Sequence, residues 1–361
     1  MGRPLLAERY RVWAERALLG AVLLDPMGQQ QALDLVRPDD MHLPWQAQVL
    51  EAMQRVRARG ALPGPMEVYR ELQHDPDLPP SMARDAVPVA NLMEAAPQAR
   101  HALAYAVMVA EGGIRQHMDE TGTRMLQASA TGNTETVLRL TAQGIRDVNG
   151  CRARWLALPS HLRRDILQPP TRVAHVQDRQ VPNRGEPARP RGPAAAAAGD
   201  RALRDLAAAP GWLAQVGRSL RLEHFARPEQ GGLYTVMQDM AADGRPVDPV
   251  TICWEAARRG LRAEPRSLEG GIGPFAVASA REVHRLGVLA QTEHAGRAIK
   301  ADAADLACRP DEMLQSAGEW LRALEAELQP GREPAPASGI REPAEAVHAP
   351  QPRQAEQEAV Q

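Results

Sequence analysis

The chain has a single lysine, Lys300, among its 361 residues, so arginine carries almost all of its positive charge. Alanine and proline are abundant as well, a combination typical of a GC-rich genome. The number of arginines is therefore weak support for nucleic-acid binding. The formal net charge is -2, so no overall excess of one sign attracts DNA or an anionic membrane.

Aromatic residues are also scarce, at 3% of the chain. A β-sandwich or barrel would need more aromatic and β-branched side chains to fill its pleated faces. Alanine, leucine, methionine and arginine are plentiful instead, and these residues favour helices. The composition therefore predicts an all-α protein.

Cysteines are few and widely separated, at Cys151, Cys253 and Cys308. Their odd number and spacing exclude a disulfide framework and a CxxC site, which indicates a reducing compartment. The apolar run at 17–24 is too short to span a membrane. We therefore expect a cytoplasmic protein without a membrane span.

Motifs that carry chemistry are missing from the sequence. No Gly-x-x-x-x-Gly-Lys-[Ser/Thr] loop occurs, and Lys300 follows no glycine-rich stretch. The glycine cluster at 270–274 follows no strand pattern, so we interpret it as a plain loop. The ten histidines show no HExxH or paired-ligand spacing, and we interpret them as scattered surface or boundary residues. The sequence thus predicts no catalytic residue, no cofactor and no metal.

One stretch occurs twice. Residues 41–72 align with residues 225–256 at a constant shift of 184 without a gap, and eight of the 32 columns are identical. Chance would give about two or three identities at average residue usage. The repeat predicts two tandem copies of one domain, because its period is far longer than that of solenoid repeats.

Helical periodicity and breakers divide each copy into a small bundle and a terminal helical hairpin. Proline and glycine flank several of the expected helices, and Asp248 followed by Pro249 is a clear helix start. The expected helices cover residues 15–25, 30–36, 44–59, 65–72 and 81–94, then a hairpin of 98–130 and 133–147, with a second hairpin of 276–306 and 312–328.

The predicted domain boundaries follow from composition. The first copy takes residues 1–168 and the second takes residues 200–330. Residues 169–199 are rich in proline, arginine and alanine and are predicted to form a disordered linker, with an end-to-end distance of about 30 Å as a flexible coil. That length lets the copies pair within one chain. Residues 331–361 are predicted to be a disordered tail.

Several short motifs carry a resemblance to a known family. Residues 15–26 read ERALLGAVLLDP, and Gly244, Pro246, Asp248 and Thr251 form a Gly-x-Pro-x-Asp-x-x-Thr phrase. In this order they resemble the N-terminal domain of DnaB-type replicative helicases. The first copy keeps the opening helix, and the second keeps the later phrase. Residues 105–109, with Arg115 beyond them, resemble the start of that domain's hairpin.

The resemblance implies a small all-α bundle whose hairpin pairs between subunits to build a collar on the hexamer, where primase is engaged. In that family, ATP hydrolysis and strand translocation belong to a following RecA-like domain, which has no counterpart in this sequence. The chain therefore resembles two collar domains and is not predicted to be an enzyme. Hairpin residues Arg115 and Arg297 are candidate interface positions.

The predicted function is a non-catalytic protein-interaction module of DNA replication that binds a replicative helicase, a primase or a helicase loader. An intrachain pseudo-dimer and a homo-oligomer are both compatible with it. One alternative is a nucleic-acid-binding accessory protein that uses the basic segment 152–191. Another is an enzyme of unrecognised chemistry, which ATPase activity in pure protein would reveal.

Overall fold

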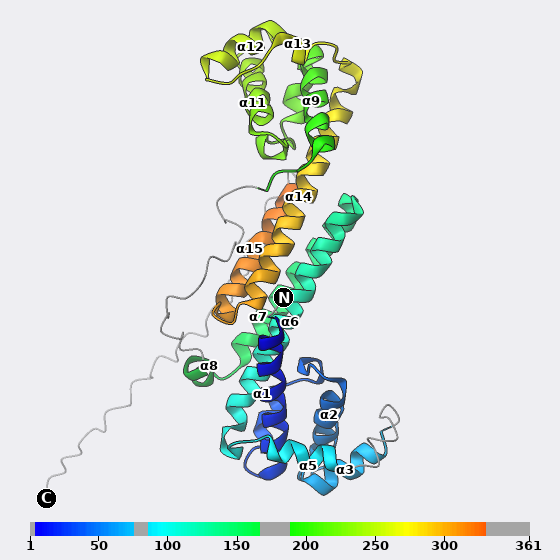
Figure 1. The fold of residues 1–361 in the computed structure, drawn as a ribbon, viewed down its shortest axis with the longest axis vertical. Coiled ribbons are helices and arrows are strands. Elements are labelled where there is room, and N and C mark those ends of the chain that lie inside the picture. The colour runs from blue at the N-terminus through cyan, green and yellow to red at the C-terminus, as the bar shows by residue number, and fades with distance from the viewer. Residues whose placement is uncertain (1–3, 76–85, 167–187, 330–361) are drawn as a thin grey trace, which may run out of the picture.

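The computed structural model describes residues 4–75, 86–166 and 188–329, and within these ranges every regular element is an α-helix or a 3-10 helix. The predicted all-α fold is confirmed. The molecule is elongated, with a small helical head at each end and four long helices between the heads (Figure 1). No described helix combines the length and hydrophobicity needed to cross a membrane.

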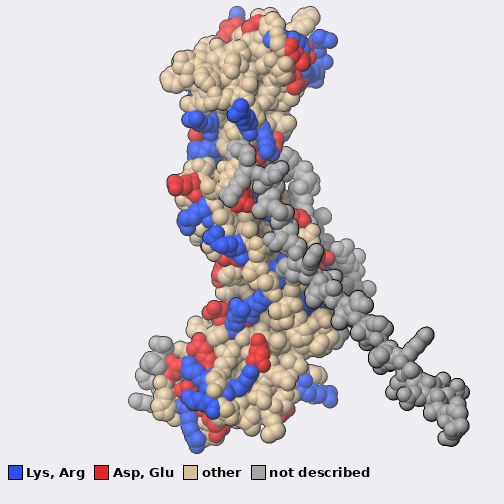
Figure 2. All heavy atoms as spheres, turned by 180° about the vertical axis from the view of Figure 1, so that it is seen from behind, with Lys and Arg blue, Asp and Glu red and all other residues tan. Residues whose placement is uncertain are grey.

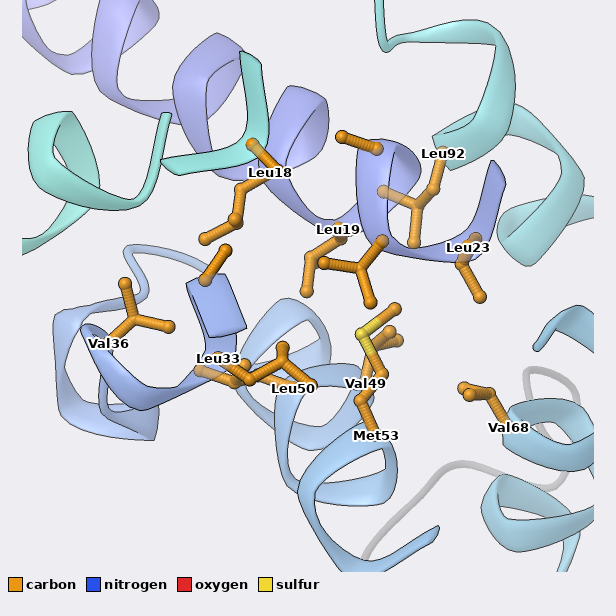
Figure 3. Packing of buried hydrophobic residues seen from close by; sticks show 14 of the residues in the cluster. Leu18, Leu19, Leu23, Leu33, Val36, Val49, Leu50, Met53, Val68 and Leu92 are labelled. Atoms are coloured by element: carbon orange, nitrogen blue, oxygen red, sulfur yellow. The ribbon is translucent and has the colours of Figure 1, made fainter. Parts of the chain in front are cut away.

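The first head comprises residues 4–101. Its elements are α1 (Pro4–Leu24), η1 (Gln30–Asp34), η2 (Pro38–Asp40), α2 (Pro44–Ala58), α3 (Pro65–Gln73), α5 (Val87–Glu94) and η3 (Ala99–His101). The apolar stripe of α1 is buried all along its second half and packs on α2, with Leu18, Leu50 and Met53 at the centre (Figure 3). A broad stripe of this kind places the helix in the middle of the bundle.

The second head comprises residues 188–275. Its elements are α9 (Pro193–Ala208), η4 (Pro210–Trp212), α10 (Leu213–Val216), η5 (Leu222–His224), α11 (Pro228–Ala242), α12 (Pro249–Arg258), α13 (Pro265–Leu268) and η6 (Gly273–Phe275). Asp248 caps α12 by accepting hydrogen bonds from the N–H groups of Val250 and Thr251. Gly60 and Gly244 end α2 and α11 with positive φ angles of 78° and 67°, as expected for a glycine after a helix.

Each head continues into a hairpin. The first hairpin is α6 (Ala102–Thr131) and α7 (Thr134–Ala157), followed by α8 (Ser160–Ile166), and the second is α14 (Ala276–Ala304) and α15 (Pro310–Leu328). Gly132 turns the first hairpin with a φ of 69°, and the Asn133 side chain then caps α7. In the middle of the molecule α6 packs on α14 and α7 packs on α15 (Figure 1).

Several boundaries expected from the sequence differ from the structure. The first helix was expected to start at residue 15, but α1 begins at Pro4. The linker was expected to reach residue 199, but residues 193–199 form the first two turns of α9, because Pro193 suits a helix start and the alanines after it are the strongest helix formers. The second helix of the first hairpin was expected to end near Asp147, but it continues through Asn149 and Gly150 to Ala157, because Cys151 and Trp155 are buried in the core beyond them. The remaining linker prediction, for residues 169–187, the tail prediction and the start of the helix expected at 81–94 fall on residues that lie partly or wholly outside the described ranges.

Positions in the two halves correspond by nearly constant shifts. The heads keep the shift of 184, while α6 and α14 correspond at 174, which matches Ala102 to Ala276 and Gly122 to Gly296. Along α7 and α15 the buried positions correspond at 173, as for Val148 and Leu321. The change from 184 to 174 reflects a connection between head and hairpin that is ten residues shorter in the second half.

Candidate functional site: the paired hairpins and the head clamps

The two hairpins share one hydrophobic core. Met118 and Met125 of α6, Trp155 of α7 and Ile299 of α14 belong to a single buried cluster. Leu321 of α15 lies in the same cluster and reaches across to Gly144 of α7. The halves therefore bury their hairpin faces against each other, and in this chain the hairpin pairing surface is already occupied.

Two glycines allow α6 and α14 to cross closely. A Cβ atom on Gly122 would lie 2.7 Å from the carbonyl oxygen of Gly296, and a Cβ on Gly296 would lie 2.9 Å from that of Gly122. Since these positions correspond between the halves, the crossing point lies on an approximate two-fold axis. The lack of a side chain is what brings the two backbones together there.

Arg115 of α6 lies between the two hairpins, beside the end of α14, and is only 7% exposed. Its guanidinium donates to the carbonyl oxygens of Asp305 (2.9 Å) and Cys308 (2.6 Å), just beyond the end of α14, and to the carboxylate of Glu111 on its own helix (2.8 Å). A cation suits the carbonyl end of a helix. Arg115 therefore connects the first hairpin to the turn of the second.

Arg297 does not cross between the halves. Its side chain is 58% exposed and pairs with Glu293 on the same helix. The cross-hairpin contact nearby is made by Lys300, whose Nζ donates to Asp119 and Thr123 of α6 at 2.7 Å. Position 126, which corresponds to Lys300 in the other half, is a leucine, so Lys300 has no matching charge across the axis.

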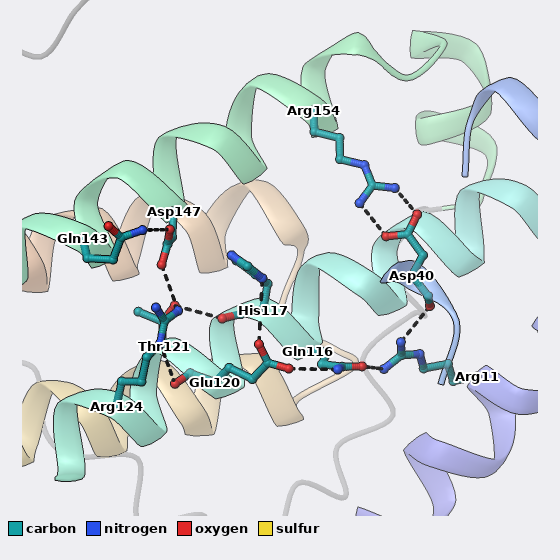
Figure 4. Close-up of polar contacts among 10 residues, drawn as sticks. All are labelled: Arg11, Asp40, Gln116, His117, Glu120, Thr121, Arg124, Gln143, Asp147 and Arg154. Carbon is teal, nitrogen blue, oxygen red and sulfur yellow. Dashed lines mark hydrogen bonds and ion pairs between the residues drawn. The ribbon is translucent and has the colours of Figure 1, made fainter. Parts of the chain in front are cut away.

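The first head is held on its hairpin by Asp40, which is 1% exposed (Figure 4). The Arg37 backbone N–H donates to one carboxylate oxygen at 2.7 Å, and the Arg154 guanidinium of α7 donates to both oxygens. Arg11 of α1 donates to the Asp40 carbonyl at 2.7 Å. The absence of a side chain at Gly113 makes room, because a Cβ there would lie 2.1 Å from the carboxylate.

The second head uses His224 at the corresponding position. Its Nδ1 accepts a hydrogen bond from the Arg221 N–H at 3.1 Å, and its Nε2 lies 2.8 Å from a carboxylate oxygen of Glu327 on α15. Gly287, the counterpart of Gly113, leaves the space for the imidazole. Burial alone would raise the pKa of Glu327, but the contact with His224 and the charge of Arg221 hold this pKa below its usual value.

The sequence interpretation of scattered surface or boundary histidines was wrong for His224, which is 1% exposed. His284 of α14 stacks edge-on against it, with ring centroids 5.0 Å apart. No local spacing signals this pair, because the residues lie sixty positions apart on different elements. The sequence signal for this site was the repeat, because the shift of 184 aligns His224 with Asp40 of the first half.

Ligand-type atoms of His224, His284 and Glu327 lie within 4.8 Å of one another, as in a metal site. The hydrogen bond accepted by Nδ1 of His224, however, puts the ring proton on Nε2, the atom that would bind the metal. The guanidinium of Arg221 also lies 3.2 Å from the carboxylate. The arrangement therefore fits a buried imidazole–carboxylate clamp better than a metal centre.

The basic segment considered for nucleic-acid binding is partly engaged in internal contacts. Arg154 binds Asp40, and Arg163 donates to the Leu158 carbonyl while its guanidinium lies 5.9 Å from the ring centre of Trp155. Residues 167–187 of the segment lie outside the described ranges. On the face shown in Figure 2, basic and acidic side chains are interspersed wherever grey atoms do not cover it.

The glycine cluster at 270–274 forms the loop expected from the sequence. It crosses α9 so closely that a Cβ on Gly271 would lie 2.0 Å from the Arg204 carbonyl oxygen, and it leads into the short helix η6. No strand precedes it in the part of the chain that the structure describes.

Comparison with known proteins gives a family match and similar solved structures, but no match among curated proteins. The family model described as the DnaB-like helicase N-terminal domain matches residues 7–111 and 203–269, which lie in the two heads and the start of α6. The crystal structure of the N-terminal domain of DnaB helicase from Mycobacterium tuberculosis is similar at 30% identity, covering 36% of this chain and 93% of that one, with a TM-score of 0.33. No curated protein matches the chain. With both matched segments falling on the same part of each half, the chain belongs to the family of the DnaB-like helicase N-terminal domain.

Proposed function

We propose that this protein is a non-catalytic interaction module of DNA replication, made of two tandem helicase-collar domains that pair with each other inside one chain. It acts in the cytoplasm and binds a replicative helicase, a primase or a helicase loader during primosome assembly. The observation that carries the proposal is the core shared by the two hairpins, to which all four long helices contribute. The family match supplies the link to the helicase collar.

Occupied hairpins constrain how such a module binds. The surface that a single collar domain would offer to a second one is already buried between α6 and α14. A partner must therefore engage the heads or the outer faces of the hairpins. This favours a regulator that docks beside a helicase collar over a subunit that inserts one unpaired hairpin into it.

The test is a binding measurement with the purified full-length chain against the host's helicase, primase and loader, each taken separately. Size-exclusion chromatography with light scattering on the free chain determines whether it is a monomer or a homo-oligomer. We expect a defined complex with one of the three proteins and no ATPase activity above background. Binding to none of them would overturn the proposal, as would ATP turnover by the pure protein.

The alternative of nucleic-acid binding has its own signature. Binding through segment 152–191 would weaken steeply with salt, with a slope that reports the number of phosphate contacts. Deletion of residues 167–187 would then abolish DNA binding and leave protein binding unchanged. Under our proposal the same deletion leaves the helicase, primase or loader complex intact, and DNA binding by the wild-type chain stays at the non-specific level.

A further inference from the structure

A hollow of about 510 Å³ lies on the seam between α9 and the start of α14 in the second head. This volume falls within the range of sites that hold a ligand or an anchoring side chain. Side chains from α9, from the loop that crosses it and from α14 line the hollow, chiefly Arg201, Arg204, Asp205, Ile272, Phe275 and Ser279.

The floor of the hollow is fixed by Asp205, which is 4% exposed. Its carboxylate accepts a hydrogen bond from the Ile272 N–H at 2.8 Å and another from the Ser279 hydroxyl. Both of its carboxylate oxygens are therefore engaged inside the protein. Glu282, which also lines the hollow, is held by the Arg285 guanidinium at 2.7 Å.

The rim, by contrast, offers two arginines that are not held in an ion pair, although the charge of Arg201 helps to lower the pKa of Glu282. Arg201 and Arg204 make no ion pair or hydrogen bond with the side chains of the described ranges, and Arg201 is exposed. Ile272 and Phe275 are 54% and 56% exposed, although both are large and apolar. Two arginines beside two exposed apolar side chains form an amphipathic surface.

The first half closes the corresponding seam with its own residues. Ala17, Gly20 and Ala21 stand where the second half has the two arginines and Asp205, and all three are buried. Gly20 lies directly under the backbone of Leu92, the last turn of α5. Tyr105 takes the place of Ser279 and packs against the core.

In the second half the helix that covers the seam is shorter, and the small residue Ser279 stands in place of Tyr105. α13 has four residues where α5 has eight. The seam between α9 and α14 is therefore left open in the half that carries Arg201 and Arg204. An occupant from outside the chain would restore what α5 and Tyr105 supply in the first half.

We propose that this seam binds an acidic amphipathic segment of the partner protein, with its carboxylates on Arg201 and Arg204 and an apolar side chain between Ile272 and Phe275. The inference rests on the proposed function and adds the docking site and the chemistry of the partner. A nucleic acid fits less well, because two arginines next to Glu282 offer few phosphate contacts.

Charge reversal tests the arginines. The double variant Arg201→Glu/Arg204→Glu in the full-length chain is expected to weaken the complex with the helicase, primase or loader by about tenfold or more. The matched control is Arg262→Glu/Arg266→Glu, which makes the same charge change at exposed positions of the same head outside the hollow. The control is expected to change the Kd by less than about twofold.

The outcomes separate the two proposals. If the wild-type chain binds none of the three proteins, the proposed function and this inference both fail. If the wild-type chain binds and the Arg201→Glu/Arg204→Glu variant binds equally well, this inference alone fails. A variant that unfolds is recognised by circular dichroism, and in that case the cross-linking measurement decides.

Cross-linking identifies the occupant directly. A photo-reactive benzoylphenylalanine at position 275 replaces one exposed aromatic residue with another, and the same residue at position 254 serves as control because Trp254 is 73% exposed on α12 of that head. We expect position 275 to cross-link to a partner segment that carries both acidic and apolar residues, and position 254 to give no such product. A cross-link to a basic segment, to DNA or within this chain would overturn the inference.

Discussion

The two heads are attached to their hairpins at corresponding points with opposite polarity. In the first half an acid of the head, Asp40, meets a base of the hairpin, Arg154. In the second half a base of the head, His224, meets an acid of the hairpin, Glu327. Both heads place the residue at the end of a short 3-10 helix, and both hairpins provide a glycine for it to pack against.

The difference shows that each head is matched to its own hairpin. If the first head sat on the second hairpin, Asp40 would face Glu327, and the exchanged second head would place His224 against Arg154. One arrangement buries two like charges and the other leaves an arginine without a carboxylate, so both are disfavoured. Two related halves in one chain can thereby avoid exchanging their heads.

The largest effect is expected from breaking the first clamp. Arg154→Glu places a carboxylate against Asp40, which is 1% exposed, and should lower the stability of the first head by about 3–5 kcal/mol. Hydrogen exchange measured on peptides of α2 should rise, while peptides of α11 should keep their protection. Arg152→Glu, at an exposed neighbouring position, is the control and should change neither.

The same site gives a rescue that a general packing defect would not allow. Asp40→His combined with Arg154→Glu installs the polarity of the second half in the first. The double variant should recover at least half of the stability lost in Arg154→Glu. The measurement is urea unfolding of the full-length chain, followed through the hydrogen exchange of peptides from the first head. No recovery would mean that the two clamps are not equivalent.

The halves should also respond to pH in opposite directions. Burial raises the pKa of Glu15 to about 7, although its hydrogen bond from His42 and the charge of Arg11 oppose this. The corresponding position in the second half is Gly199, which carries no acid. In the second half, burial and the neighbouring His224 lower the pKa of His284, against the pull of Glu327.

The direction in which stability changes with pH depends on whether the folded or the unfolded state binds the proton more tightly. With its folded pKa raised, Glu15 contributes stability that is complete below the ordinary glutamate pKa of 4.5 and is lost as the pH rises towards 7, on the order of 3 kcal/mol. His284 is disfavoured in its charged form, so its contribution is present above 6.5 and is lost as the pH falls. Hydrogen exchange measured at about pH 5 and about pH 7 should show that the first head is less stable at pH 7 than at pH 5. The second head should be more stable at pH 7 than at pH 5.

Glu15→Gln is the matched variant, because an amide can still accept from the His42 N–H but does not titrate. It should abolish the pH response of the first head and leave that of the second unchanged. A first head with the same slope in the variant would assign the effect to another group.

Much of each head could be predicted from the sequence because its signals are local. Pro44 and Pro228 start helices, and Gly60 and Gly244 end them with the positive φ that glycine allows. The resemblance to the helicase family rested on such phrases, and the family match falls on the same segments.

The contacts between the halves, and those between each head and its own hairpin, could not be predicted in this way. Gly122 looks like a helix breaker in the sequence, yet it lies inside a helix of 30 residues. A glycine is present there because it lets α14 approach closely. The His224–Glu327 contact joins residues more than a hundred positions apart, and no spacing rule covers such a distance. Only an alignment of the two halves would have shown that Asp40 and His224 occupy one site.

The two candidate interface arginines sharpen the comparison further. Arg115→Ala removes donors from two carbonyls at the end of α14 and leaves Glu111 unpaired, so we expect a loss of about 1.5–3 kcal/mol. Arg297→Ala removes an exposed pair within one helix and should cost less than about 0.5 kcal/mol. Urea unfolding of the hairpins measures both, and equal effects would contradict the placement of Arg115 between the halves.

The smallest effect is expected where the two-fold relation between the hairpins is broken. Lys300 packs on Gly122 and binds Asp119, whereas Leu126 packs on Gly296 in the corresponding place. Lys300→Leu makes the crossing symmetric in composition. It exchanges an ion pair whose lysine and aspartate side chains are 34% and 47% exposed for apolar packing, so stability should change by less than about 1 kcal/mol. Asp119→Ala, which leaves the lysine stem in place, is the control in the same unfolding measurement. If Lys300→Leu were far more destabilising than Asp119→Ala, the lysine would be contributing through its close packing on Gly122, and the two sides of the crossing would differ in shape as well as in charge.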